Sequence, residues 1–236
     1  MLDTTKLGSL YFDGQPQEAG CEYNDGQITF GPAVPGKELQ WIKVNGLLIA
    51  DRCVCTHISW KQLHAQGLVF GAPFQIDGQF YLCRCLKVGA EDGVSNEWDA
   101  ALDETGEDDE IWHWEGQYFW GQETLGNRAS ARAVRGCLSA RLWVTSGATN
   151  RFARVGFRPA LEPLDSDPCS LETLIGKTIQ LYGPRGVSLE GRLQDVDDYD
   201  FILSPTAGAP TRCFWTSKAG DNLVVSRDSV LWVKEA

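Results

Sequence analysis

Short runs of apolar residues, interrupted every few positions by Gly, Pro, Asp or Asn, recur along the chain. Runs of this length between turn-forming residues are typical of strands. Residues 9–12 and 27–30 are the first two such runs, and we interpret residues 1–39 as an N-terminal β extension. The pattern therefore predicts much strand and loop from the beginning of the chain.

Two hairpins and one helix have local sequence signals. Asn45-Gly46 and Asp77-Gly78 each lie between two apolar runs. Both dipeptides favour two-residue hairpin turns, because their residues tolerate positive φ. A short helix is expected to begin at Ser59, whose hydroxyl can cap its first turn.

The composition changes at residues 162–168, which are rich in Pro, Asp and Ser. Such a stretch is typical of a boundary between compact domains, so we place one domain at 40–164, a linker at 165–169 and a second domain at 170–236. Five short strand-like runs in the second domain predict a small β-barrel. These runs are residues 178–182, 187–193, 201–204, 213–216 and 222–233.

The formal net charge of −11 argues against a general nucleic-acid coat, because phosphate binding needs a concentrated basic surface. No apolar run approaches the roughly 20 residues that span a bilayer. Residues 1–20 also lack the basic start and apolar centre of a signal peptide. We therefore expect a cytoplasmic or virion-associated protein without a membrane span, whose eight cysteines remain free thiols.

Charge is segregated along the first domain. Residues 97–110 contain eight acidic residues and no basic one, whereas residues 124–161 contain seven arginines and no acid. We interpret the acidic run as a solvated loop or helix start that pairs in part with these arginines. Calcium binding by residues 97–110 is the weaker alternative, because their spacing matches no calcium loop closely.

Residue types that carry catalysis are sparse. Cys53-Val54-Cys55 and Cys83-Arg84-Cys85 lack the Cys-x2-4-Cys spacing usual for zinc, and we interpret these cysteines as buried packing residues. The three histidines stand in no recognisable triad or metal motif; they are His57, His64 and His113. The sequence thus predicts no enzyme, no cofactor and no metal site.

The end of the first domain carries a specific pattern. It consists of Arg135-Gly136, then Ser139-Ala140-Arg141 and Trp143, then Gly156-Phe157-Arg158-Pro159. This pattern resembles the C-terminal part of the C-type-lectin-like fold, as found in formylglycine-generating-enzyme-like domains and, most closely, in the variable proteins of diversity-generating retroelements. A looser resemblance extends upstream to about residue 40, and includes the Trp-rich run 112–120.

The resemblance implies a ligand-binding face between two anchors. The framework residues that it implies are Arg135, Gly136, Arg141, Trp143, Gly156 and Arg158. The ligand-binding residues that we expect between them are Leu138, Leu142, Val144, Thr145, Thr149, Asn150, Phe152 and Arg154. Their mixture of apolar, hydroxyl, amide and cationic groups suits an exposed contact surface, although an ordinary irregular loop would also produce it.

The resemblance does not carry enzyme activity with it. A formylglycine-generating oxidoreductase would use two cysteines in this region, and the segment offers only Cys137. In the second domain, residues 176–181, 189–193 and 225–230 resemble the two halves of an Sm-like barrel, and an unrelated SH3-like barrel would look similar.

We therefore expect an α+β, β-rich chain, with a C-type-lectin-like domain followed by a small β-barrel, that recognises a protein or cell-surface ligand without catalysis. The resemblance implies a phage- or retroelement-associated protein. Three alternatives stay open: a phage accessory protein that inhibits a host defence component, a formylglycine-generating-type oxidoreductase, and an RNA-binding or oligomerising Sm-like module. If the Sm-like module is the functional part, we expect it to form a homo-oligomer through the C-terminal barrel rather than to bind nucleic acid.

Overall fold

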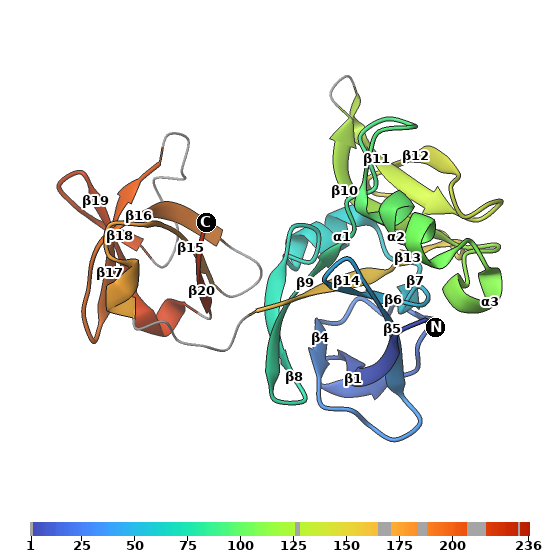
Figure 1. Ribbon diagram of the computed structural model, residues 1–236, viewed down its shortest axis with the longest axis horizontal. Coiled ribbons are helices and arrows are strands. Elements are labelled where there is room, and N and C mark those ends of the chain that lie inside the picture. The colour runs from blue at the N-terminus through green and yellow to red at the C-terminus, as the bar shows by residue number, and fades with distance from the viewer. Residues whose placement is uncertain (1, 126–127, 165–170, 184–187, 207–215, 231) are drawn as a thin grey trace. The chain divides into compact units, whose positions relative to one another are not determined.

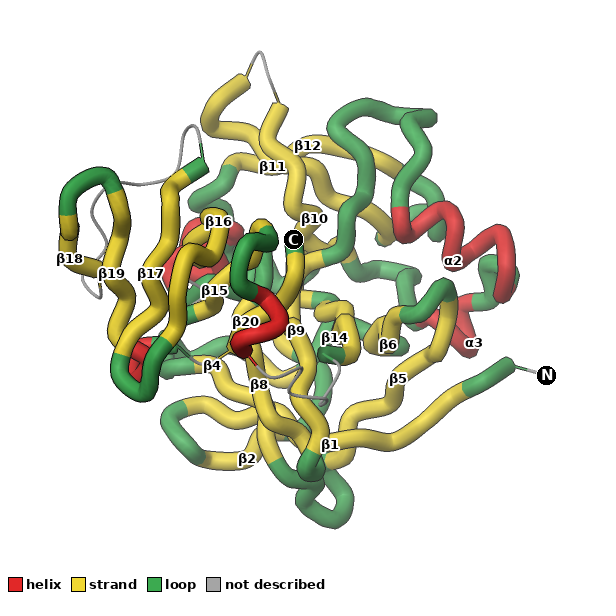
Figure 2. Tube along the Cα trace, turned by 60° about the vertical axis from the view of Figure 1, so that its left-hand side comes forward, coloured by secondary structure: helices red, strands yellow, loops and turns green. Residues whose placement is uncertain are grey.

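The computed structural model describes residues 2–125, 128–164, 171–183, 188–206, 216–230 and 232–236 (Figure 1). The chain divides into two compact units, Met1–Leu164 and Asp165–Ala236, which are described separately. Strands dominate both units, and the helices that connect strands are short (Figure 2). The division falls after Leu164, where the Pro-, Asp- and Ser-rich stretch predicts a boundary. The predicted linker, 165–169, lies outside the described residues.

The first unit contains a large sheet, in which the described strands number eight. In order across the sheet they are β2 (Gln15–Gln17), β1 (Thr4–Phe12), β5 (Glu38–Val44), β6 (Leu47–Ala50), β14 (Pro159–Pro163), β9 (Gln79–Cys85) and β8 (Ala72–Ile76), and β4 (Ile28–Gly31) also pairs with β1. Residues 1–39 are thus not a peripheral extension. Strand β1 lies inside the sheet, and its Leu10 and Phe12 are buried in the core.

Both predicted hairpins are confirmed. Asn45 and Gly46 join β5 to β6, and Asp77 and Gly78 join β8 to β9, with positive φ at all four residues. The second turn also connects distant parts of the sheet. The Asp77 carboxylate accepts hydrogen bonds at 2.9 Å from the backbone N–H groups of Gly8, in β1, and of Ala33, which follows β4. The carboxylate thus joins the turn between β8 and β9 to β1 and to the segment after β4.

A second sheet of the first unit contains six described strands. Their order is β12 (Trp143–Gly147), β11 (Arg128–Gly136), β10 (Tyr118–Leu125), β13 (Val155–Phe157), β7 (Cys55–Thr56) and β3 (Cys21–Glu22). Three helices accompany the sheets: α1 (Trp60–Ala65), α2 (Glu97–Thr105) and α3 (Asp109–Trp112). Ser59 caps α1, as the sequence predicts, and the structure adds a reciprocal capping box between Ser59 and Gln62. No helix among the described residues combines the length and the apolar character that crossing a membrane requires.

Aromatic and thiol side chains fill the interior of the first unit. Trp98, Trp112 and Phe119 pack edge to face in one cluster of buried residues, with ring centroids 4.9 Å apart in each of the two pairs. Cysteines of both Cys-x-Cys pairs are buried free thiols, and burial raises the pKa of Cys53 to about 11. Protonated thiols of this kind pack as small apolar groups.

The second unit is an antiparallel sheet of six described strands. Across the sheet they are β18 (Thr216–Ala219), β19 (Asn222–Ser226), β17 (Asp200–Pro205), β16 (Ser188–Val196), β15 (Thr178–Tyr182) and β20 (Trp232–Glu235). The single strand predicted over 222–233 is wrong, because the 3-10 turn η3 (Arg227–Ser229) separates β19 from β20. Residues 213–215 of another predicted strand lie outside the described residues. A further 3-10 turn, η1 (Leu171–Leu174), precedes β15.

Candidate functional site

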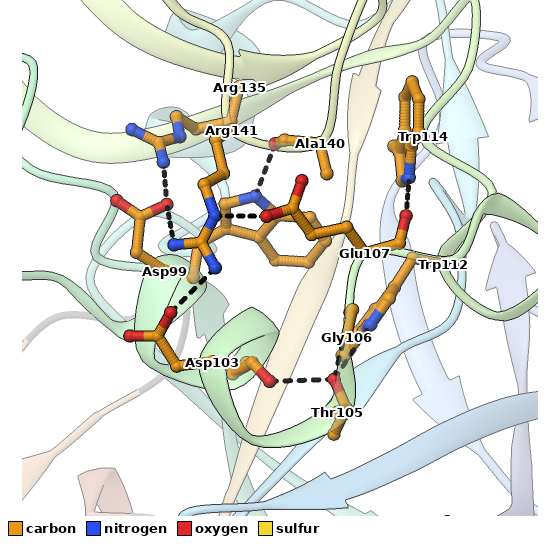
Figure 3. A network of polar contacts seen from close by, with 12 residues as sticks. Asp99, Asp103, Thr105, Gly106, Glu107, Trp112, Trp114, Arg135, Ala140 and Arg141 are labelled. Atoms are coloured by element: carbon orange, nitrogen blue, oxygen red, sulfur yellow. Dashed lines mark hydrogen bonds and ion pairs between the residues drawn. The ribbon is translucent and has the colours of Figure 1, made fainter.

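The acidic run and the arginine-rich segment are joined by ion pairs, as their segregated charges predict. The first residues of the acidic run form helix α2. Arg135 of β11, which is only 1 % exposed, donates a hydrogen bond to Asp99 on that helix. Arg141 lies between three carboxylates: its guanidinium is 2.7 Å from Asp103, 2.5 Å from Glu107 and 3.7 Å from Asp99 (Figure 3). These contacts fasten α2 and the residues after it to the segment 135–141.

Arg158 braces the same region from inside the core. It is fully buried, and burial lowers the pKa of its guanidinium. Its Nη2 atom donates to the carbonyl oxygens of Trp112, at 2.6 Å, and His113, at 3.2 Å, and Nη1 donates to that of Asp51 at 3.2 Å. The guanidinium also lies over the rings of Trp98 and Phe119. One side chain therefore connects β13 with the ends of β6 and α3.

Two framework glycines allow backbones to approach closely. Gly136 has φ +95°, and a Cβ atom there would lie 2.6 Å from the carbonyl oxygen of Gln117. At Gly156 a Cβ atom would lie 2.5 Å from the carbonyl oxygen of Cys55 in the neighbouring strand. The remaining framework residue, Trp143, donates from Nε1 to the carbonyl oxygen of Gly89 at 2.9 Å. All six predicted framework residues thus have defined structural contacts.

Residues 148–154 form a loop that is attached to the rest of the first unit. Arg151 donates to the carbonyl oxygen of His57 at 2.8 Å and pairs with Asp25 at 2.9 Å. Near the start of the loop, Asn150 donates from Nδ2 to the Ser146 hydroxyl at 3.1 Å. These contacts fix one side of the loop, and its Phe152 and Arg154 side chains are exposed.

An open groove of about 470 Å³ lies between this loop and the second sheet. Four of the eight predicted ligand-binding residues line it: Val144, Thr145, Phe152 and Arg154. Its other lining residues were missed in the sequence: Tyr118, Val134, Ser146, Ala153 and Val155. Tyr118 and Val134 come from β10 and β11, and only the pairing of these strands brings them beside β12.

The other four predicted ligand-binding residues do not line the groove. Leu138 is 78 % exposed in the turn after β11, and Leu142 closes that turn by accepting a hydrogen bond from Gly136 N–H at 3.2 Å. Asn150 has a structural role in the loop, and Thr149 is exposed beside it. The structure thus separates the predicted face into one groove and one protruding turn.

The groove combines an apolar floor with polar groups at its rim. Val134 and Val155 are buried, Val144 is half-buried, and Phe152 is 54 % exposed. Burial and the neighbouring Cys137 thiol raise the pKa of Tyr118, while the positive charge of Arg154 opposes this shift. The raised pKa keeps the Tyr118 phenol protonated at neutral pH, where it shares a hydrogen bond with the Cys137 thiol.

A larger cleft, of about 850 Å³, lies elsewhere in the first unit, and Arg84 and Glu97 form an ion pair in it. Arg84 donates to both carboxylate oxygens of Glu97 at 2.8 Å, and the Lys87 N–H donates to Glu97 at 2.9 Å. Burial alone raises the pKa of Glu97, but these hydrogen bonds and the positive charges of Arg84 and Lys87 outweigh it, so the pKa is lowered. The folded chain therefore stabilises the Glu97 carboxylate.

Glu97→Gln is expected to lower the free energy of unfolding at neutral pH by about 2 kcal/mol, because buried Arg84 loses its nearer carboxylate partner and keeps only Glu162, at 3.5 Å. Since the folded-state pKa of Glu97 is depressed, this contribution is fully present above the unfolded-state pKa of about 4.3 and is lost as the pH falls through the folded-state value. Urea unfolding of both proteins from about pH 7 down to about pH 3 measures the difference. A difference that stays constant over this range would contradict the assignment.

The histidines and possible metal ligands of the described residues lie apart from one another. Within the ranges that the structure describes, no three His, Cys, Asp or Glu side chains gather so as to hold a metal ion. The histidines have separate partners, with His64 stacked on Trp60, His57 3.6 Å from Glu22 and His113 3.3 Å from Asp51. Compared with protein-family models, curated proteins and solved structures, the chain matches none.

Proposed function

We propose that the first unit is a C-type-lectin-like ligand-recognition domain, similar to the variable proteins of diversity-generating retroelements, and that the groove beside β12 binds a protein ligand without catalysis. The second unit is proposed to be a small Sm-like or SH3-like barrel. One observation carries the functional proposal. Four residues expected to bind ligand from the family resemblance line one open groove: Val144, Thr145, Phe152 and Arg154.

The surroundings of the groove support recognition. Buried Arg135 and Arg158 brace the backbone below it, and Arg151 fixes the adjoining loop. Binding residues on loops held by a rigid scaffold lose little conformational entropy when a ligand docks. An exposed Phe beside an apolar floor is also a typical anchor for a protein partner.

The same groove would serve the alternative of a phage accessory protein that inhibits a host defence component, because both roles need only a specific protein-binding face. The oxidoreductase alternative gains no support. Cys137, the cysteine of this segment, is a free thiol with only 4 % of its surface exposed.

Two matched variants test whether the groove recognises a protein. We would immobilise the native chain, the Phe152→Ala variant and the Leu138→Ala variant and expose each to bacterial lysate and envelope fractions. Phe152 lines the groove and Leu138 does not, although both are large exposed apolar residues. We expect a partner that native chain and Leu138→Ala capture equally and that Phe152→Ala binds at least about tenfold more weakly.

Loss of capture by Leu138→Ala alone would place the contact on the protruding turn instead of the groove. Equal binding of a captured partner to all three proteins would contradict both locations. Circular dichroism of each variant confirms that a loss of capture does not come from unfolding.

A further inference from the structure

Arg154 stands apart among the arginines of residues 124–161 whose side chains the structure describes. Most arginines of residues 124–161 whose side chains are described contact acids, carbonyl groups or rings: Arg132 lies over Trp60, Arg135 and Arg141 bind α2 carboxylates, Arg151 binds Asp25, and Arg158 is buried. Arg154 differs from them. Its side chain is exposed in the groove and makes no hydrogen bond or ion pair with any residue that the structure describes.

The groove around Arg154 has a positive charge that nothing in its lining balances. None of its described lining residues carries a carboxylate, although the whole chain has a net charge of −11. Tyr118 and Thr145 add hydroxyl groups to the same lining. A guanidinium with hydroxyl donors nearby is suited to bind a carboxylate, because charge-assisted hydrogen bonds are stronger than neutral ones.

The apolar part of the groove is adjacent to this cation. Phe152 lies in the same loop as Arg154, and Val155 follows Arg154 at the start of β13. Val134 of β11 and Val144 of β12 are paired in register on the sheet. A volume of about 470 Å³ lies in the range of pockets that enclose a small ligand or a few side chains. A ligand that fills the groove therefore presents an apolar group close to its negative charge.

The groove also reaches β12, the last described strand on one side of the second sheet. Among the described strands, β12 pairs only with β11, and three consecutive β12 residues, Val144 to Ser146, line the groove. The groove also touches residues of β11, β10 and β13, the next three strands of the sheet, so it extends over one face of the sheet and ends at β12. Unpaired N–H and C=O groups at the edge of a sheet can pair with another extended chain.

From this juxtaposition we infer that the groove binds an extended segment of a partner protein in which an Asp or Glu is next to a large apolar residue. The carboxylate pairs with Arg154, the apolar side chain packs on Phe152 and the valines, and the segment runs along β12. This inference rests on the proposed function, whose site it shares, and adds the chemistry of the ligand.

Two libraries of random linear peptides provide the probe. Both have the same length and the same apolar residues beside a central position, which is Asp or Glu in one library and Asn or Gln in the other. We expect the native full-length chain to retain the acidic library at least about tenfold better than the amide library. Arg154→Glu should abolish this preference, and a library with central Lys should then bind the variant better than it binds native chain.

Equal retention of both libraries by the native chain would overturn the inference. So would an unchanged preference in Arg154→Glu, or self-association of the native chain that Arg154→Glu removes, because a second copy would then occupy the groove. Phe152→Ala separates the two proposals. If Phe152→Ala weakens binding of a captured protein while Arg154→Glu does not, the groove recognises a protein and only the carboxylate requirement fails; if neither variant weakens it, both proposals fail.

Discussion

Replacing Arg158 with alanine is expected to lower the free energy of unfolding by about 4 kcal/mol or more. The guanidinium supplies hydrogen bonds to the buried carbonyl groups of Asp51 and Trp112 and to the partly buried one of His113, and it lies over the rings of Trp98 and Phe119. A buried carbonyl without a donor costs about 1–3 kcal/mol, and truncation of a large core side chain leaves a cavity that adds to this loss. Urea unfolding followed by tryptophan fluorescence measures the change.

Two companion variants separate the causes of this effect. Arg158→Met keeps most of the volume but provides no donors, so it should lose about half as much stability as Arg158→Ala. Arg154→Ala removes an exposed arginine without partners among the described residues and should change the free energy of unfolding by less than about 0.5 kcal/mol. Native stability in Arg158→Met would show that the hydrogen bonds contribute nothing and that Arg158 only fills space.

Gly156→Ala is expected to destabilise the chain by about 3 kcal/mol, or on the order of 10 °C in Tm. The new methyl group would lie 2.5 Å from the carbonyl oxygen of Cys55 and 2.9 Å from the Cys53 sulfur, so β13 must move away from β7. Because Val155 also lines the groove, this movement should weaken ligand binding as well. Thermal unfolding by circular dichroism gives the first effect, and the acidic peptide library gives the second.

Gly31→Ala is the matched control for this substitution. Gly31 lies in a strand of the large sheet without positive φ, and a Cβ atom there would meet only the Tyr11 ring at an ordinary distance of 3.4 Å. Gly31→Ala should therefore lower the free energy of unfolding by less than about 1 kcal/mol. Equal losses in both variants would mean that any side chain at a strand glycine is harmful and that the approach of β13 to β7 is not special.

Features that depend on a few neighbouring residues were predictable from the sequence. The Asn45-Gly46 and Asp77-Gly78 turns and the Ser59 cap are set by local backbone preferences, and each occurs as predicted. Pairing between the acidic run and the arginines was also predictable, since two long segments of opposite charge in one unit have few other partners.

Features that depend on strand order were not predictable. The central place of β1 requires pairing with β5, and Tyr118 joins the groove only because β10 and β11 bring it beside β12. Asn150 was expected to bind ligand, but its amide contacts Ser146, four residues earlier in the chain. Neither residue type nor spacing distinguishes an amide that faces a ligand from one that holds its own loop.

Along residues 132–158, the side chains that brace the backbone and those that line the groove occupy different positions. Arg135, Gly136 and Arg158 make buried contacts, whereas Thr145, Phe152 and Arg154 point to solvent. Replacement of the second group leaves the contacts of the first intact. The groove is thus a natural place to build a combinatorial library, in which specificity can be selected at the exposed positions while the scaffold keeps its melting temperature.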